Sequence, residues 1–346
     1  MNILHITETV SGASGVATFV RELDAALRTK GVASRVACPG REAQECAIGA
    51  DGCDIVHIHG LWLPFYHQAS EEARRRGIPV VWSTHGMSAP WSMRHKRWKK
   101  LAAWWMYQRR DLRRAAAIHC TTGLEVAWNS RLGFANCFVA PLGTAEASRA
   151  DAPRRGEPGV RVLLFVGRIH PVKGLENLIR AWAEATGADA KSGRAAPWRL
   201  RIVGPDEGGY MSVLKALVER LSVSDTVEFA GPRFGADLSS EYDGCDCLVL
   251  PSFTENFGAT VIDAMAHGRP CIASTATPWK ALRERGCGWW VDNAPATLAA
   301  AIRDMMSAGD AARAEMGERG RAMVAAEYTW SAVADRMIGL YGRCMK

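Results

Sequence analysis

The chain has 346 residues, which at about 150 residues per domain predicts two domains. Hydrophobic residues make up 48% and charged residues 23%, proportions that exclude a disordered chain and a collagen. The net charge is +7, from 43 Lys and Arg against 36 Asp and Glu. No apolar run approaches the roughly 18 residues that span a bilayer. The first ten residues have no basic start and contain Glu8, unlike a secretory signal, so we expect a cytoplasmic protein.

The ten cysteines predict neither a disulfide framework nor a metal site. They form no C-x-x-C pair, and no His/Cys set has zinc-ligand spacing. Several of them, such as Cys120 and Cys271, lie in apolar, strand-like segments. We therefore expect reduced, buried cysteines that behave as small hydrophobic residues.

The first half alternates short apolar runs with helical patterns. The expected strands are 2–7, 34–38, 54–59, 80–84, 117–121 and 137–140. The expected helices are 16–30, 66–76, a long basic helix at about 95–115, and 124–132. This alternation is typical of a parallel sheet that is covered by helices on both faces.

The same alternation restarts after Asp151–Gly159, a segment whose prolines, glycines and mixed charges predict an interdomain linker. The expected strands are 162–166, 199–203, 226–230, 247–251, 270–274 and 289–291, the helices between them include 210–221, 259–267 and 297–307, and 311–346 is almost wholly helical. The sequence therefore predicts an α/β protein of two tandem doubly wound domains, with a ligand cleft between them.

The segment Pro251–Ile272 (PSFTENFGATVIDAMAHGRPCI) carries the strongest chemical pattern. A strand ends at Pro251, a polar loop follows with Glu255, and a helix opens after Gly258 with Asp263 on it. A helix N-terminus suits a phosphate, and the two carboxylates could reach one polar ligand. The alternative is that Glu255 caps the helix and Asp263 is a solvated surface acid.

Two further glycine-containing segments follow strands. In Val166–Gly174 (VGRIHPVKG), Arg168 and Lys173 lie between a strand and a helix, which fits a diphosphate, although both could be ordinary surface cations. In Thr9–Thr18 (TVSGASGVAT), Gly12 and Gly15 would let the backbone approach a ligand, but the match to G-x-G-x-x-G is poor.

The order of these segments resembles the retaining glycosyltransferases of the family-4 type, which have a GT-B fold. The resemblance rests on the Gly-rich first loop, VGRIHPVKG, RIVGPDE and PSFTENFGATVIDAMAHGRPCI. In addition, HIHGLW at 57–62 and STHGM at 83–87 resemble the subgroup that builds bacterial exopolysaccharides and O-antigens. The resemblance implies transfer of a sugar, with retention, from a nucleotide-diphosphate sugar to a glycan acceptor that is lipid-linked in such pathways.

The resemblance also implies residue roles. It assigns catalysis to Glu255 and His85, both facing the donor sugar. The donor diphosphate is assigned to Arg168, Lys173, Gly15, Asn256, Phe257 and Gly258. The ribose and base are assigned to Asp263 and Gly204, although the family has Glu where this chain has Asp263, a side chain shorter by roughly 1.5 Å. No D-x-D motif is present, so we expect neither a metal nor another cofactor.

The family's domain pattern is also implied for this chain. Residues 1–155 plus about 330–346 would form an N-terminal acceptor-side domain, onto which the C-terminal helix returns. Residues 156–329 would form the donor-binding domain. His57 and His59 alternate with apolar residues on one strand, and they could either line the acceptor site or be satisfied, partly buried histidines.

The segment Arg94–Arg114 contains nine Lys and Arg and one acid, Asp111, so its net charge of +8 exceeds that of the whole chain. Cations together with Trp98 and Trp105 indicate contact with an anionic membrane surface, which would make the protein peripheral at the inner face of the cell membrane. The alternative is a solvated helix that covers the domain. No nucleic-acid recognition motif accompanies the patch, so no nucleic-acid partner is expected.

Two other functions remain open at this point. One is a sugar-nucleotide epimerase on the same architecture, and the other is a catalytically weak binding or scaffold protein, which Asp263 makes worth testing.

Overall fold

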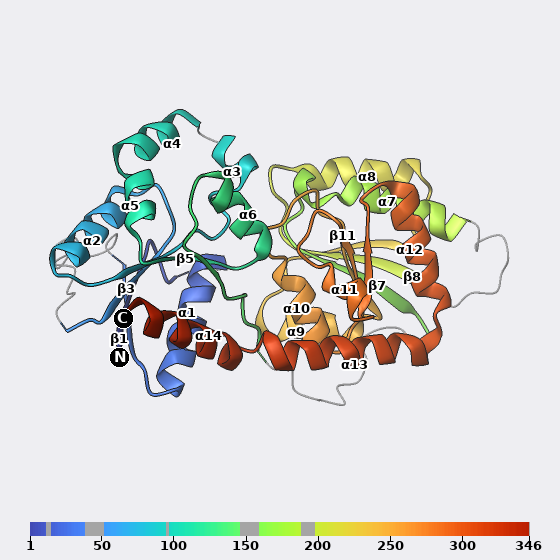
Figure 1. Cartoon of the computed structure of the whole chain (residues 1–346). Helices are drawn as coiled ribbons and strands as arrows, with labels where there is room; N and C mark the ends of the chain where they lie inside the picture. Colours follow the sequence, from blue (N-terminus) through green and yellow to red (C-terminus); the bar gives the residue numbers. More distant parts are fainter. Residues whose placement is uncertain (12–14, 39–51, 95–96, 146–158, 188–197, 346) are drawn as a thin grey trace. The chain divides into compact units, whose positions relative to one another are not determined.

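The computed structural model describes residues 1–11, 15–38, 52–94, 97–145, 159–187 and 198–345 (Figure 1). The chain divides into two compact units, Met1–Gly143 with Tyr328–Lys346, and Thr144–Glu327. Gly12 and residues 151–158 of the expected linker lie outside the described residues. Each unit is an α/β domain built on a parallel sheet, so the predicted fold class is confirmed.

Unit 1 contains a six-stranded sheet in the order β2-β1-β3-β4-β5-β6, in which every neighbouring pair is parallel. Its strands are β1 (Asn2–Thr7), β2 (Ala33–Ala37), β3 (Ile55–His59), β4 (Val80–Ser83), β5 (Ala117–Cys120) and β6 (Cys137–Val139). Its helices are α1 (Gly15–Thr29), α2 (Pro64–Arg75), α3 (Pro90–Arg94), α4 (Arg97–Ala103), α5 (Arg109–Arg114), α6 (Gly123–Arg131) and α14 (Trp330–Cys344).

Alternate residues of each strand in unit 1 face two different hydrophobic clusters, as the period of a strand requires. On one face, Ile3, Ile55 and Val81 pack with α1 and with the C-terminal helix α14. On the other face, Leu4, Ile58 and other buried residues pack with α2, α5 and Phe134. Helix α14 begins at the N-cap Thr329, and its apolar stripe buries Val333, Met337 and Tyr341.

Unit 2 contains a second parallel six-stranded sheet in the order β12-β11-β10-β7-β8-β9. Its strands are β7 (Arg161–Val166), β8 (Trp198–Val203), β9 (Val227–Gly231), β10 (Cys247–Leu250), β11 (Cys271–Ser274) and β12 (Gly288–Val291). Its helices are α7 (Leu175–Gly187), α8 (Tyr210–Arg220), α9 (Gly235–Gly244), α10 (Ala259–Ala266), α11 (Ala281–Glu284), α12 (Pro295–Ser307) and α13 (Gly309–Glu327), and a short 3-10 turn spans Pro171–Lys173. Strand β7 is central because its apolar residues are buried on both faces.

The basic segment differs from the single helix that the sequence predicted. It is described from Arg97, and its i→i−4 ladder is interrupted by a π-helical turn at Trp104–Gln108 between α4 and α5. Helix α9 was not expected, because its apolar residues show little periodicity and only Tyr242 is buried. The almost wholly helical stretch expected over 311–346 consists of two helices, α13 and α14, and the returning C-terminal helix expected at about 330–346 corresponds to α14.

The nine described cysteines are free thiols, in agreement with the expected reduced chain, and Cys120, Cys245, Cys247, Cys271 and Cys287 are buried. Within the described ranges, no helix combines the length and the apolar character needed to cross a membrane.

Candidate functional site

In unit 2, the predicted donor-binding residues gather at the carboxyl ends of three adjacent strands, β10, β7 and β8. The loops leave these strands at Pro251, Gly167 and Gly204. A Cβ on Gly204 would lie 1.8 Å from the carbonyl oxygen of Gly167, and one on Gly174 would lie 2.1 Å from that of Pro251. Glycine is therefore required at 174 and 204 because the backbones approach each other closely. In open α/β sheets, this end of the strands is where ligands bind.

Glu255 and Lys173 form an ion pair at this edge, although 82 positions separate them in the chain. Both side chains are largely buried, with 13% and 15% of their surface exposed. The hydroxyl of Ser252 also donates to Glu255, at 2.8 Å. No side chain caps helix α10, so the alternative in which Glu255 acts as the helix cap is wrong.

Arg168 follows β7 but points to a different partner. Its guanidinium pairs with Glu207, and both side chains are about half exposed. The structure therefore brings Lys173 and Glu255 together but leaves Arg168 in a solvated ion pair at the β8 side of the same edge. An exposed pair of this kind contributes little to stability, so Arg168 can exchange Glu207 for a ligand phosphate at small cost.

The loop before α10 is held by one aromatic side chain. The indole N–H of Trp279 donates to the carbonyl of Phe257 at 2.6 Å, and the two rings meet edge to face with centroids 5.2 Å apart. Gly258, the N-cap of α10, has φ 79°, and a Cβ there would lie 2.8 Å from the side chain of Leu250. Asn256 lies in this loop and Phe257 is buried in it, so the backbone N–H groups at the start of α10 occupy a fixed position.

Asp263 is bonded within the protein. The hydroxyl of Thr144 donates to its carboxylate at 2.7 Å. Burial raises the pKa of Asp263 to about 6, while the bond from Thr144 and the nearby His267 act in the opposite direction. The alternative of a solvated surface acid is therefore wrong, since this carboxyl group is largely enclosed.

In unit 1, five histidine side chains form one cluster on the sheet face that α1 and α14 cover. His5, His57, His59 and His119 come from β1, β3 and β5, and His85 follows β4. The ring of Phe19 on α1 packs against three of them, with centroids 5.2 to 5.8 Å away. The pKa of every histidine in the cluster is lowered, because burial disfavours the imidazolium form.

The structure corrects the acceptor-side role that the sequence suggested for His57 and His59. Both side chains are 0% exposed. The two nitrogens of His57 are bonded to Tyr341 and Ser83, each at 2.7 Å, and those of His59 to His5 at 2.9 Å and His85 at 3.2 Å. These residues are satisfied, buried histidines, the second of the two sequence interpretations.

His85 occupies an unusual backbone position that a buried carboxylate stabilises. It has φ 47°, in the left-handed region that most non-glycine residues avoid. Glu125 is 0% exposed and accepts from the Thr84 hydroxyl and the Gly86 N–H, each at 2.5 Å. Its other oxygen accepts from the N–H and hydroxyl of Thr121. Thr121 thus fixes the carboxylate of Glu125, which in turn holds the turn that presents His85. Gly15, the remaining predicted residue of unit 1, is exposed at the first position of α1.

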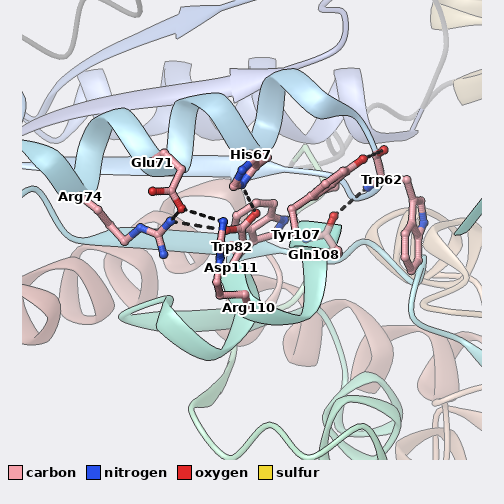
Figure 2. A network of polar contacts seen from close by, with 10 residues as sticks. Trp62, His67, Glu71, Arg74, Trp82, Tyr107, Gln108, Arg110 and Asp111 are labelled. Carbon is pink, nitrogen blue, oxygen red and sulfur yellow. Dashed lines mark hydrogen bonds and ion pairs between the residues drawn. The ribbon is translucent and has the colours of Figure 1, made fainter. Parts of the chain in front are cut away.

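The π-helical turn anchors the basic segment to the loop after β3 (Figure 2). The Trp62 N–H donates to the side-chain oxygen of Gln108 at 2.8 Å, and the Tyr107 hydroxyl donates to the Trp62 carbonyl at 2.6 Å. Trp62 has φ 80°, so these two bonds stabilise a strained residue. The π-turn places Tyr107 and Gln108 where they can form these two hydrogen bonds with Trp62. Single π-helical turns inside α-helices occur frequently at functional sites.

A second contact in Figure 2 buries the only acid of the basic segment. Asp111 is 1% exposed and lies 2.8 Å from the Nδ1 atom of His67, and Arg74 approaches its other oxygen at 3.5 Å. Burial raises the pKa of Asp111, whereas His67 and Arg74 lower it. Helix α5 is therefore fixed to α2 through its single carboxylate, and its cations are left on the outer side.

Several functional candidates of unit 1 and unit 2 were missed in the sequence. Glu125 and Thr144 belong to no sequence motif, so no signal in the sequence indicates them. His5 and His119 lie on strands with the same alternation as His57, so the period-two pattern across β1, β3 and β5 was the signal that could have found the cluster.

The two units match two sequence families. The family described as "Glycosyl transferases group 1" matches residues 149–323, about half of the chain, and "Glycosyl transferase 4-like domain" matches residues 46–143. The chain is 32% identical over 238 residues to a D-inositol 3-phosphate glycosyltransferase of Kineococcus radiotolerans, covering 61% of this chain and 53% of that protein. It is 34% identical over 209 residues to the enzyme of that name from Segniliparus rotundus, covering 59% and 44%. The chain thus spans about half the length of these relatives.

Solved structures resemble the whole chain. A sucrose-phosphate synthase from Thermosynechococcus elongatus has a TM-score of 0.77 and 21% identity, covering 99% of this chain and 98% of that one. Anabaena Alr3699/HepE in complex with UDP-glucose has a TM-score of 0.74 and 17% identity, covering 98% of both chains. At these identities the likeness shows the fold, which is the expected GT-B type with two Rossmann-like units. Since its longer family match spans half of the sequence, the chain belongs to the group 1 glycosyl transferases.

Proposed function

We propose that this protein transfers a sugar, with retention, from a nucleotide-diphosphate sugar to a glycan acceptor. The proposal rests mainly on the ion pair between Lys173 and Glu255, which lies at the strand ends of unit 2 beside the start of α10. A cation and helix N–H groups stabilise a leaving diphosphate, and a nearby carboxylate faces the positive charge that develops on the sugar.

The same residues suggest how the nucleotide-sugar donor would bind. Lys173 and Arg168 would bind the diphosphate with the backbone of Gly15 and of residues 256–258, while Asp263 and Gly204 would meet the ribose and base. The structural neighbour solved with UDP-glucose supports a uridine nucleotide as the first to test. Since fixed cations supply the positive charge, we propose that turnover needs no metal and persists in a chelator.

The acceptor has two candidate chemistries, each supported by a different observation. A lipid-linked glycan is supported by the cationic, Trp-rich surface of α4 and α5, described below. A phosphorylated polyol is supported by the relatives named D-inositol 3-phosphate glycosyltransferase. We favour the lipid-linked glycan, because the exposed aromatic side chains have no role with a small polar acceptor.

The test is a donor screen followed by a transfer assay. A thermal-shift panel of UDP-, GDP-, ADP- and CMP-sugars identifies the donor, since a ligand of the native state raises the melting temperature. The donor is then incubated with a lipid-linked glycan, with inositol phosphate, or with no acceptor. Product with retained anomeric configuration supports the proposal. Epimerised donor without acceptor would instead indicate the epimerase, and binding without turnover the scaffold protein.

We further propose that unit 1 attaches to anionic membranes through an α4–α5 patch, defined as Trp98, Leu101, Trp105, Met106 and the cations Arg97, Lys99, Arg109, Arg113 and Arg114. Trp98 is 81%, Trp105 67% and Met106 73% exposed, although they are large apolar side chains. The Arg109 guanidinium lies over the Trp105 ring at 5.3 Å, at the edge of a cavity of about 250 Å³ that four arginines line. Each cation near an anionic surface contributes about 1 kcal/mol.

Vesicle flotation tests this attachment. Replacing Arg97, Lys99, Arg113 and Arg114 with Gln should abolish binding to vesicles that contain anionic lipid, as should high salt, but spare donor binding. Lys100 is left unchanged because it donates to the Ser92 carbonyl at 2.6 Å. The matched control replaces four exposed cations of unit 2 with Gln: Arg180, Lys215, Arg220 and Lys280. Equal flotation of both variants would exclude the α4–α5 patch as the attachment site.

A further inference from the structure

The histidine cluster of unit 1 consists of two separate hydrogen-bonded chains. One runs from Tyr341 through His57 and Ser83 to His119. The other joins His5, His59 and His85, with His5 Nδ1 2.9 Å from His59 Nε2 and His59 Nδ1 3.2 Å from His85 Nε2. Only the second chain ends at a residue that is partly exposed, namely His85.

The first chain has one consistent set of donors. His119 Nε2 faces the Ala140 carbonyl at 2.8 Å and must therefore carry a proton. In a neutral imidazole the Nδ1 atom then accepts, so the Ser83 hydroxyl donates to His119. The Ser83 oxygen in turn accepts from His57 Nε2, and His57 Nδ1 accepts from the Tyr341 hydroxyl. Every polar atom of this chain is satisfied, and it leaves no proton to exchange with His85.

The second chain has two possible directions, which differ in what they leave unpaired. His5 Nε2 is buried and has no hydrogen-bond partner within the described part of the chain. If the protons lie on the Nδ1 atoms, each ring donates toward His85, and the unpaired atom of His5 is an acceptor. If they lie on the Nε2 atoms, the unpaired atom is an N–H. An orphaned buried N–H is rarer than an under-satisfied acceptor, so the first direction is favoured.

We propose that His59 and His5 are positioning residues that hold His85 as a neutral imidazole with its proton on Nδ1, so that His85 meets the sugar or phosphate of the donor as a hydrogen-bond donor and not as a base. The role of His85 at the donor rests on the proposed function. The direction of the hydrogen bonds through His5, His59 and His85 does not rest on the proposed function, because it follows from unit 1 alone.

The surroundings oppose protonation of this chain at every ring. Burial lowers the pKa of His85 to about 3, with the nearby His119 as a smaller cause. Burial also lowers the pKa of His5 to about 4, where Asp24 raises it and Arg28 lowers it by lesser amounts. A proton accepted at His85 Nδ1 would have to remain on a buried ring or pass to His5, whose Nε2 has no acceptor for it. A neutral His85 that donates its Nδ1 proton avoids placing a positive charge on a buried ring.

Two substitutions at His59 test its hydrogen bond to His85 and its hydrogen bond to His5 separately. The amide group of Asn lies as many bonds from Cα as His Nδ1, and that of Gln as many as His Nε2. His59→Asn can therefore direct its NH₂ group toward His85 as a donor. His59→Gln can instead direct its amide oxygen toward His5, which accepts from His5 Nδ1–H, and it leaves His85 Nε2 without a donor. Tyr341→Phe is the control, because it alters the other chain only.

The tautomer is measured by ¹⁵N NMR of the imidazole nitrogens near pH 7, which needs neither donor nor acceptor. We expect a protonated Nδ1 on His85 in the native protein, in His59→Asn and in Tyr341→Phe, and a shift of the proton toward Nε2 in His59→Gln. A proton on Nε2 of His85 in the native protein would overturn the proposal, even if neither variant folds. An identical Nδ1 proton in both His59 variants would overturn the role of His59.

The catalytic readout is separate. In the transfer assay, His59→Gln should lower kcat by about 10-fold, while His59→Asn stays within about 3-fold of the native enzyme. If the tautomers behave as expected but the native protein neither binds nor turns over a nucleotide sugar, the proposed function fails. The direction of the hydrogen bonds from His5 through His59 to His85 then still stands. If transfer occurs and both variants lose activity equally, His59 serves the structure and does not set the tautomer.

Discussion

One carboxylate oxygen of Glu255 accepts from both the Lys173 ammonium and the Ser252 hydroxyl. The acid assigned to the donor sugar and the cation assigned to its diphosphate are therefore directly coupled. A change at either residue alters the charge of the other's surroundings, so the two must be tested by different readouts.

Replacing Glu255 with Gln should reduce sugar transfer by at least about 10-fold, which corresponds to a loss of about 1.4 kcal/mol of transition-state stabilisation. The amide keeps the size and the Ser252 contact but removes the negative charge. Binding of the nucleoside diphosphate should be unchanged or tighter, because Lys173 is no longer neutralised. Near-normal turnover in a folded variant would remove Glu255 from catalysis.

Replacing Lys173 with Met should weaken binding of the nucleoside diphosphate by about 10-fold and leave binding of the nucleoside almost unchanged. Lys173 supplies a charge for phosphate, and the apolar stem is preserved in Met. Calorimetry with both ligands measures the difference. Equal losses for the two ligands would mean that Lys173 only maintains the loop through Glu255.

Donor binding should weaken as the pH falls below about 6, through protonation of Asp263. Its pKa is raised to about 6, so the carboxylate that would accept from ribose hydroxyls is lost below that pH. Asp263→Asn should bind the donor less tightly and without this pH dependence. Thr144→Val should move the transition to higher pH, because the Thr144 hydroxyl stabilises the charged carboxylate. A wild-type affinity that is constant from pH 7.5 to 5 would exclude a direct role for Asp263.

The strands of unit 2 and the strand ends that carry Lys173 and Glu255 could be predicted from the sequence, since both depend on local patterns. Strands β7 and β10 are continuous apolar runs, and glycines and polar residues mark their ends. The parallel order then brings Lys173 and Glu255 to one edge, as the family resemblance implied for these residues.

The remaining contacts depend on packing between distant segments. The partner of Asp263 is Thr144, 119 positions away, and no motif indicates that pair. The alternation on β3 placed His57 and His59 on one face, but it could not show that α14 covers this face with Tyr341. The π-turn was also hidden, because the stretch 97–114 has good helical periodicity and only the contacts of Gln108 and Tyr107 explain the extra residue.

Replacing Glu125 with Gln should destabilise unit 1 by about 2–4 kcal/mol and disturb the turn at His85. Glu125 is fully buried and accepts from four donors, which an amide cannot do because its NH₂ group would face two of them. Urea unfolding measures the stability, and the His85 ¹⁵N signals report the turn. Glu219→Gln, at an exposed site of α8, is the matched control and should change neither. A stable variant with native His85 signals would show that the turn keeps its conformation without the Glu125 carboxylate.

Unit 1 should lose stability steeply as the pH falls from 7 to 5.5, before unit 2 does. His5, His57, His59, His85 and His119 have lowered pKa values in the folded chain and ordinary values near 6.5 when unfolded. Below pH 6.5 the unfolded state therefore binds more protons, and the free energy of unfolding decreases, by about 1 kcal/mol per histidine over this interval. Unit 2 has the opposite contribution from Asp263, whose raised pKa makes its folded state take up a proton near pH 6. The raised pKa of Asp111 acts in the same direction in unit 1, but there one carboxyl group opposes five histidines. Pulse proteolysis in urea, with the surviving fragments identified by mass spectrometry, follows the two units separately. If unit 1 proved equally stable at pH 7 and 5.5, the histidines would have to remain accessible to protons in the folded state, contrary to their burial.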